Sequence, residues 1–169
     1  CNRNSVDEPI SIASLKRFVT DQIYSQPYNS PDPIPYKSEE KAAVIGAGNM
    51  GAQIAAHLAN VGIPSLLMDI VPTELLPEEA KRGLTLQSPE VRNRVTKTLF
   101  DRAKKLSPAP LFVPEAASLV RLGNVEDNMA EIKDADWIIE AILERMDLKL
   151  AIHAQIAAHA RPDALVTTN

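Results

Sequence analysis

Three glycines stand close together in the sequence segment VIGAGNMGAQIA, with the spacing G-x-G-x-x-G. Each of them suits a loop that holds the pyrophosphate of a dinucleotide. Gly46 permits a tight turn out of a strand, Gly48 leaves space for phosphates beside the backbone, and Gly51 lets the next helix pack closely on the sheet. Asn49 and Met50 lie between the last two glycines, at the start of a helix whose N–H groups attract negative charge. We therefore predict that these five residues form a phosphate-binding turn.

An acidic residue follows the glycines at a distance that suits the same ligand. Asp69 ends the apolar segment SLLMD and lies 23 residues after Gly46. A carboxylate at this place accepts hydrogen bonds from the ribose hydroxyls of adenosine. It also repels a 2′-phosphate, and the next residues, Ile70 and Val71, provide no cation to bind one. The sequence therefore predicts NAD, rather than NADP, as the cofactor.

Alternating strands and helices are expected to position the turn and the acid. Short apolar segments predict strands at 42–45, 65–69, 120–122, 137–141 and 165–168. Helical periodicity predicts helices at 49–60, 127–133 and 147–160. Gly62 stands where a helix often ends with a glycine. Such alternation is typical of α/β proteins, so we expect a Rossmann-type, doubly wound parallel sheet with helices on both faces.

A long insertion is expected between the second and third strands, where a single crossover helix would suffice. Residues 72–119 occupy this place, and 90–106 have the periodicity of an amphipathic helix that Pro108 and Pro110 end. Its apolar side is predicted to be formed by Val91, Val95, Leu99, Ala103 and Leu106. We therefore expect a helical hairpin inserted after strand two.

The composition changes near residue 41, which predicts two parts in the chain. Residues 1–40 hold five of the thirteen prolines and all three tyrosines, and 11–25 have the spacing of an amphipathic helix. The segment after this helix is rich in Pro, Ser and Asp, as extended linkers are. We expect a leader and linker over residues 1–40 and a cofactor-binding domain over 41–169.

Charge and composition favour a globular protein of the cytoplasm. The 169 residues carry a net charge of −4, which argues against a nucleic-acid partner, and no apolar segment is long enough for a membrane span. The single cysteine, Cys1, permits no disulfide within the chain. Because the chain starts with Cys and ends on a predicted strand, we interpret both ends as cuts. A lipidated N-terminal cysteine is the alternative.

Three segments together resemble the N-terminal, NAD-binding domain of 3-hydroxyacyl-CoA dehydrogenases. They are KAAVIGAGNMGAQIAAHLANVG, DADWIIEAILERMDLK and LVTTN. The resemblance covers residues 41–169, and the insertion also stands where this family carries a helical hairpin. The resemblance implies NAD-dependent oxidation of a 3-hydroxyacyl-CoA substrate to 3-oxoacyl-CoA in fatty acid β-oxidation.

The same resemblance implies roles for residues outside the glycine turn. Glu144 matches a glutamate near the nicotinamide ribose, and Lys149 matches a lysine on the cofactor side of the cleft. Glu140, in the same segment, is expected to be structural. Basic residues of the inserted helix are expected to meet the phosphates of CoA, and the last residue is expected to match a substrate-side asparagine. These residues are Arg92, Arg94, Lys97 and Asn169.

No catalytic residue is expected in this chain, and no metal site. The family's serine would follow two residues after Asn169, and its general base, a histidine paired with a glutamate, would come later. His57, His153 and His159 fall in predicted helices and are interpreted as ordinary helix residues. We therefore expect a truncated fold that is inactive alone. The whole protein is expected to be a homodimer or part of a multifunctional β-oxidation enzyme.

Two other functions stay open at this point. A dehydrogenase of another hydroxy acid could use the same cofactor fold, although it would lack the basic hairpin after strand two. Alternatively, the chain could bind NAD without catalysing a reaction, because a cofactor-binding fold does not by itself determine a substrate.

Overall fold

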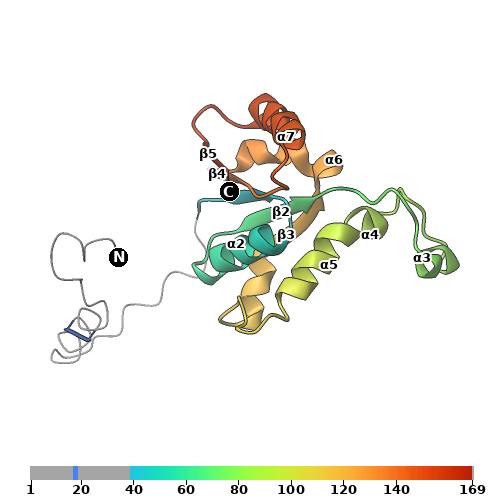
Figure 1. Cartoon of the computed structure of the whole chain (residues 1–169), viewed down its shortest axis with the longest axis horizontal. Coiled ribbons are helices and arrows are strands. Elements are labelled where there is room, and N and C mark those ends of the chain that lie inside the picture. The colour runs from blue at the N-terminus through green and yellow to red at the C-terminus, as the bar shows by residue number, and fades with distance from the viewer. Residues whose placement is uncertain (1–16, 19–38, 169) are drawn as a thin grey trace, which may run out of the picture. The chain divides into compact units, whose positions relative to one another are not determined.

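The computed structural model describes residues 17–18 and 39–168, and the second of these ranges contains a parallel sheet of five strands (Figure 1). The strands are β1 (Ala42–Ile45), β2 (Ser65–Asp69), β3 (Val120–Asn124), β4 (Trp137–Glu140) and β5 (Leu165–Thr168). They lie in the order β3-β2-β1-β4-β5, with every adjacent pair parallel. The predicted parallel α/β sheet is confirmed. The third strand extends to Asn124, beyond its predicted end, and the fourth ends at Glu140, before its predicted end.

Helices and 3-10 turns connect these strands. The segment between β1 and β2 forms α2 (Asn49–Asn60), which Gly62 follows with a φ of +81°. The segment between β2 and β3 forms α3 (Pro77–Lys81), α4 (Pro89–Arg92), α5 (Arg94–Ala103) and η2 (Pro114–Leu119). The last two connections form α6 (Val125–Asn128), η3 (Met129–Asp134) and α7 (Met146–His159). The helix predicted over 127–133 is therefore α6 followed by η3.

Helices cover both faces of the sheet, as a doubly wound fold requires (Figure 1). In β1, Ala42 and Val44 belong to a core formed with α2, α5 and η2, whereas Ala43 and Ile45 belong to a second core formed with η3 and α7. All four residues are buried. A strand that packs against helices on both faces has to be apolar throughout, which explains the uninterrupted apolar segment in the sequence.

The strand order places a crevice at the carboxyl ends of the strands. The chain proceeds from β1 to β2 and β3 on one side, and then crosses to β4 and β5 on the other side. In an open parallel sheet, ligands bind at the carboxyl ends of the strands where the order reverses. Here this place lies between the ends of β1 and β4, where Ile45 pairs with Glu140.

The insertion after β2 is helical, but the single helix predicted over 90–106 is wrong. The structure has two helices, α4 and α5, which are separated at Asn93, and α5 ends at Ala103. At the break, the side chain of Asn93 accepts a hydrogen bond from Asn124 of β3 at 2.7 Å. Leu106 follows the end of α5 and is exposed instead of facing the core. Figure 1 shows α3 at the tip of an arm that projects from the sheet.

The predicted leader lies almost entirely outside the described residues. Of the helix predicted over 11–25, only residues 17 and 18 are described, and both are helical. The boundary between leader and domain at residue 41 therefore stays a prediction. Within the described part of the chain, no helix is long and apolar enough to cross a membrane.

Candidate cofactor site

Gly46 lies in the turn that follows β1, and two observations require a glycine there. Its φ is +103°, a conformation that residues with a side chain rarely adopt. A Cβ atom at Gly46 would also lie 2.5 Å from the carbonyl oxygen of Ala141, in the loop after β4. The turn after β1 and the loop after β4 therefore touch at the crevice, and only a glycine permits this approach.

The other two glycines differ in what surrounds them. A Cβ atom at Gly51 would lie 1.7 Å from the carbonyl oxygen of Gly46, so Gly51 lets α2 pack directly on the turn. A Cβ atom at Gly48 would meet nothing within 4 Å. The backbone at the start of α2 thus faces open space, and the adjacent Asn49 and Met50 are exposed. This geometry fits a pyrophosphate group, which needs room beside the N–H groups of a helix start.

Asp69 ends β2 beside the same turn. Its Oδ2 atom accepts a hydrogen bond from the Ala47 backbone N–H at 2.6 Å, and its Oδ1 atom accepts one from the Ile70 N–H at 2.7 Å. Each carboxylate oxygen can accept a further hydrogen bond, because an ionised carboxylate offers about four lone-pair positions. The structure therefore brings the predicted acid and the predicted glycine turn together, as ribose recognition requires.

A cavity of about 210 Å³ opens between the glycine turn and α5. Ala47, Gly48 and Asn49 line it on the side of the turn, and Leu99 and Arg102 line it on the side of α5. The sequence analysis did not select Arg102, which lies among several cations on the polar side of a helix. Its place beside the turn depends on the packing of α5 against α2, which the sequence does not reveal.

Glu140 ends β4 at the crevice and is fully buried. Its Oε2 atom accepts hydrogen bonds from the Thr168 hydroxyl at 2.6 Å and from Lys149 Nζ at 3.0 Å. Its Oε1 atom accepts one from the Ile142 N–H at 2.8 Å. Burial by itself would raise the pKa of Glu140, but these hydrogen bonds outweigh it and lower the pKa below its usual value. Glu140 is thus an ionised buried carboxylate.

Lys149 and Glu144, the two residues that the family resemblance selected near the nicotinamide, lie together in the structure. Lys149 Nζ lies 3.3 Å from Glu144 Oε2, and the Lys149 side chain is only 13% exposed, whereas that of Glu144 is 84% exposed. The hydrogen bond to Glu140, more than the contact with Glu144, raises the pKa of Lys149. Lys149 is therefore a charged lysine between a buried carboxylate and an exposed one.

The three histidines are helix residues, as predicted, but one of them lies near this cluster. His57 belongs to α2, and His153 and His159 belong to α7. His153 Nε2 lies 3.6 Å from Glu140 Oε2, and its side chain is 40% exposed. That none of the three histidines is catalytic stays a prediction.

The basic residues predicted to bind CoA phosphates all have acidic partners in the structure. Arg92 donates to Asp127 at 2.6 Å and to Glu126 at 2.8 Å. These two hydrogen bonds, the one to Asp127 first, raise the pKa of Arg92. In separate ion pairs, Arg94 contacts Glu79 and Lys97 contacts Asp101. The pairs of Arg92 tie the insertion to α6, whereas the pair of Arg94 joins α5 to α3 within the insertion. A CoA contact stays a prediction for all three cations. Asn169 lies outside the described residues.

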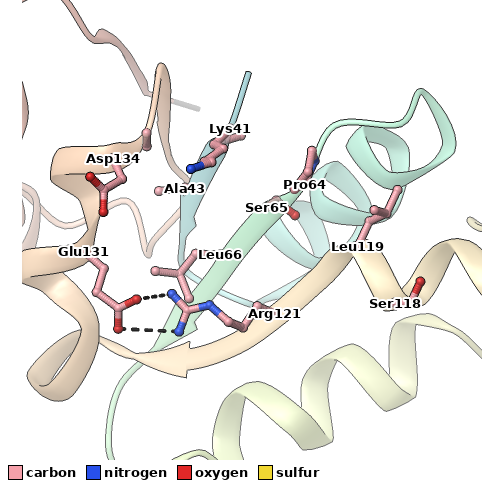
Figure 2. A pocket seen from close by; sticks show the side chains of 12 residues that line it. Lys41, Ala43, Pro64, Ser65, Leu66, Ser118, Leu119, Arg121, Glu131 and Asp134 are labelled. Carbon is pink, nitrogen blue, oxygen red and sulfur yellow. Dashed lines mark hydrogen bonds and ion pairs between the residues drawn. The ribbon is translucent and has the colours of Figure 1, made fainter. Parts of the chain in front are cut away.

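A larger cavity, of about 370 Å³, lies at the amino ends of the strands, opposite the crevice. Figure 2 shows that Arg121 of β3 and Glu131 of η3 form an ion pair in it, near Lys41 and Ser65 at the starts of β1 and β2. A dinucleotide binds at the carboxyl ends of parallel strands. This cavity lies at their amino ends and is therefore not the cofactor site.

Comparison with known proteins agrees with the geometry. The chain is 46% identical over 134 residues to a probable 3-hydroxyacyl-CoA dehydrogenase of Bacillus subtilis (strain 168), which covers 79% of this chain and 17% of that protein. It is 30% identical over 152 residues to the fatty acid oxidation complex subunit alpha of Ectopseudomonas oleovorans, which covers 90% of this chain and 19% of the relative. The chain thus spans about a fifth of the length of these two relatives.

Solved structures share the fold. A diketoreductase structure matches with a TM-score of 0.51 at 24% sequence identity, over 77% of this chain and 41% of the other. The family model described as 3-hydroxyacyl-CoA dehydrogenase, NAD binding domain, matches residues 41–169, which include the glycine turn, Asp69 and the cluster around Glu140. The chain therefore belongs to the 3-hydroxyacyl-CoA dehydrogenase family and carries its NAD-binding domain.

Proposed function

We propose that the protein oxidises 3-hydroxyacyl-CoA to 3-oxoacyl-CoA in fatty acid β-oxidation, with this chain supplying the half that binds NAD. The observation that carries the proposal is the contact between Asp69 and the glycine turn at the crevice of the sheet. It combines a place for a pyrophosphate with an acceptor for ribose hydroxyls. Membership of the family supports the choice of substrate.

Each part of the site has a proposed task toward NAD. The backbone from Gly46 to Gly51 and the start of α2 hold the pyrophosphate, and Asp69 accepts hydrogen bonds from the adenosine ribose. Glu144 and Lys149 bind near the nicotinamide ribose. When bound, NAD supplies the acceptor for the hydride that leaves the substrate carbon. The chain's own task is to orient the cofactor so that this carbon can approach it.

The substrate half of the reaction is proposed for basic residues of the insertion and for the last residue of the chain. Arg92, Arg94 and Lys97 are proposed for the CoA phosphates, although their ion pairs would have to open or be shared. Asn169 is proposed to help hold the developing carbonyl. The general base is expected in a part of the protein that corresponds to the region of the relatives beyond the matched residues. We further propose a cytoplasmic protein that acts as a homodimer or within a multifunctional β-oxidation enzyme.

The test measures binding and turnover separately. The 169-residue chain should bind NADH in a fluorescence titration but should not reduce NAD with 3-hydroxybutyryl-CoA. The same domain extended through the residues that its longer relatives carry should reduce NAD with this substrate. General-base removal alone typically lowers a rate by about 10²–10⁴-fold. Rapid turnover by the short chain would mean that the catalytic residues are wrongly assigned, and an inactive extended chain would contradict the proposed substrate.

A further inference from the structure

We infer that Glu140 is a positioning residue of the cofactor site, which fixes the ammonium group of Lys149 and, through it, the carboxylate of Glu144. The inference rests on the proposed function, in which Lys149 and Glu144 contact the nicotinamide ribose. Because Glu140 is fully buried, it acts through these groups and not on a ligand.

The hydrogen bonds around Glu140 fix Lys149 in one position. Glu140 and the Thr168 hydroxyl each accept from Lys149 Nζ at 3.0 Å, and the same hydroxyl donates to Glu140. Three groups from β4, β5 and α7 thus form a closed triangle. A long lysine side chain loses considerable rotational freedom in such an arrangement, and the three contacts together offset that loss.

The charges explain why a carboxylate is needed at this place. Without a buried partner, desolvation of the largely buried ammonium group of Lys149 would reduce the stability of the fold. Glu144 is too exposed to replace Glu140 as that partner. With Glu140 in place, Lys149 also lies within 3.3 Å of Glu144 and restrains this exposed side chain. The buried Glu140 therefore positions the ammonium group of Lys149, and Lys149 in turn positions the exposed carboxylate of Glu144.

The position of Glu140 connects this cluster to the glycine turn. Its Oε1 atom accepts from the N–H of Ile142, in the loop that leaves β4. The preceding residue, Ala141, donates its N–H to Ile45 of β1 at 2.8 Å and packs against Gly46. The Glu140 side chain thus holds both the loop that touches the phosphate-binding turn and the ammonium group of Lys149.

A double-mutant cycle on NADH affinity tests the inference with the full chain. Glu140→Gln keeps the size and the acceptor for Ile142, but it turns an amide N–H₂ group toward Lys149. It should weaken NADH binding roughly ten-fold, and Lys149→Met should weaken it further, because it removes the group proposed to contact the ribose together with its restraint. The double variant should bind NADH within about two-fold of the weaker single variant, since contacting residues that act together are not additive.

Two variants serve as matched controls. Glu131→Gln removes the same charge from an ion pair with Arg121 at the amino ends of the strands (Figure 2) and should leave NADH affinity unchanged. His153→Gln alters another α7 side chain near Glu140, at a distance too long for a hydrogen bond, and should have a small effect. Circular dichroism at the temperature of the titration establishes that each variant is folded.

The outcomes separate this inference from the proposed function. An unmodified chain that does not bind NADH would contradict both. NADH binding that Glu140→Gln does not weaken, or two single effects that multiply in the double variant, would contradict the positioning role alone. A merely structural role would lower thermal stability without this dependence on Lys149, so non-additive effects on affinity support positioning.

Discussion

The carboxylate of Asp69 accepts a hydrogen bond from the backbone N–H of Ala47 at 2.6 Å, although the two residues are 22 positions apart in the sequence. The acid that ends β2 is thereby fixed against the turn that follows β1. A dinucleotide with its pyrophosphate at this turn would have the adenosine ribose beside the same carboxylate. We therefore propose that the choice between NAD and NADP depends on this carboxylate.

Asp69→Ala should reduce the preference for NADH over NADPH. In the unmodified chain we expect a difference of roughly 2–4 kcal/mol in binding free energy, because the 2′-phosphate would be repelled and left without a partner. The variant should lose most of this difference. Fluorescence titration with both nucleotides measures it, and Asp147→Ala, in an exposed ion pair with Arg145, is the control. Equal affinities for the two nucleotides in the unmodified chain would refute the role of Asp69.

Gly48→Ala should weaken NADH binding strongly while leaving the fold intact. A Cβ atom at this position meets nothing within 4 Å, and the φ of −58° suits any residue. The folded chain therefore tolerates the methyl group, which instead occupies the space proposed for the pyrophosphate. The melting temperature and the NADH affinity should be measured on the same sample. Unchanged affinity would show that the turn does not hold phosphate.

Gly51→Ala should have the opposite pattern, with a loss of stability as the primary effect. Its Cβ atom would lie 1.7 Å from the Gly46 carbonyl oxygen, so α2 would have to move away from the turn. Overpacking of this kind typically costs about 1–3 kcal/mol. Urea unfolding gives the free energy of unfolding. A variant as stable as the unmodified chain would mean that this packing is looser than the geometry indicates.

The strands and the glycine turn could be predicted from the sequence because their signals are local. An apolar segment such as Ala42–Ile45 is long enough for one buried strand, and the glycine spacing fixes the turn beside it. Asp69 was predicted from its place at the end of the next apolar segment. Each of these features depends on a few neighbouring residues, so the sequence carries them directly.

The features that were not predicted depend on contacts between distant residues. At the helix break, Asn93 accepts a hydrogen bond from Asn124, 31 positions away. The importance of Glu140 follows from its complete burial and from Thr168, 28 positions away. In the sequence, Glu140 is one of several acids in its segment. The sequence analysis expects Glu140 to be structural, but its place as the buried partner of Lys149 depends on the packing of β4, β5 and α7.

Asn124→Ala should destabilise the protein and loosen the insertion. The buried amide accepts hydrogen bonds from the N–H groups of Glu126 and Asp127 at the start of α6 and donates to Asn93. Loss of a helix cap together with an unpaired partner costs about 2–3 kcal/mol. Urea unfolding measures the loss, with the exposed Ser118→Ala as the control, for which we expect at most about 0.5 kcal/mol. A cost as small as that of the control would contradict a linking role for Asn124.

The stability that Glu140 contributes should depend on pH in a defined direction. Its pKa in the folded protein lies below the usual value of 4.5, so the folded state binds this proton less readily than the unfolded state. The contribution is therefore complete above about pH 4.5 and is lost as the pH falls through the lower, folded-state pKa. Lys149, whose pKa is raised above 10.5, behaves in the opposite way and loses its contribution only at high pH.

The measurement compares the unmodified chain with Glu140→Gln by urea unfolding between about pH 7 and about pH 3. The difference in unfolding free energy should be largest near neutral pH and should shrink toward acid, because the variant cannot be protonated at this position. Other acids with a lowered pKa, such as Asp127 and Asp136, are present in both proteins and cancel in the difference. A difference that stays constant over this range would mean that Glu140 is not an ionised carboxylate in the folded protein, and its hold on Lys149 would then need another explanation.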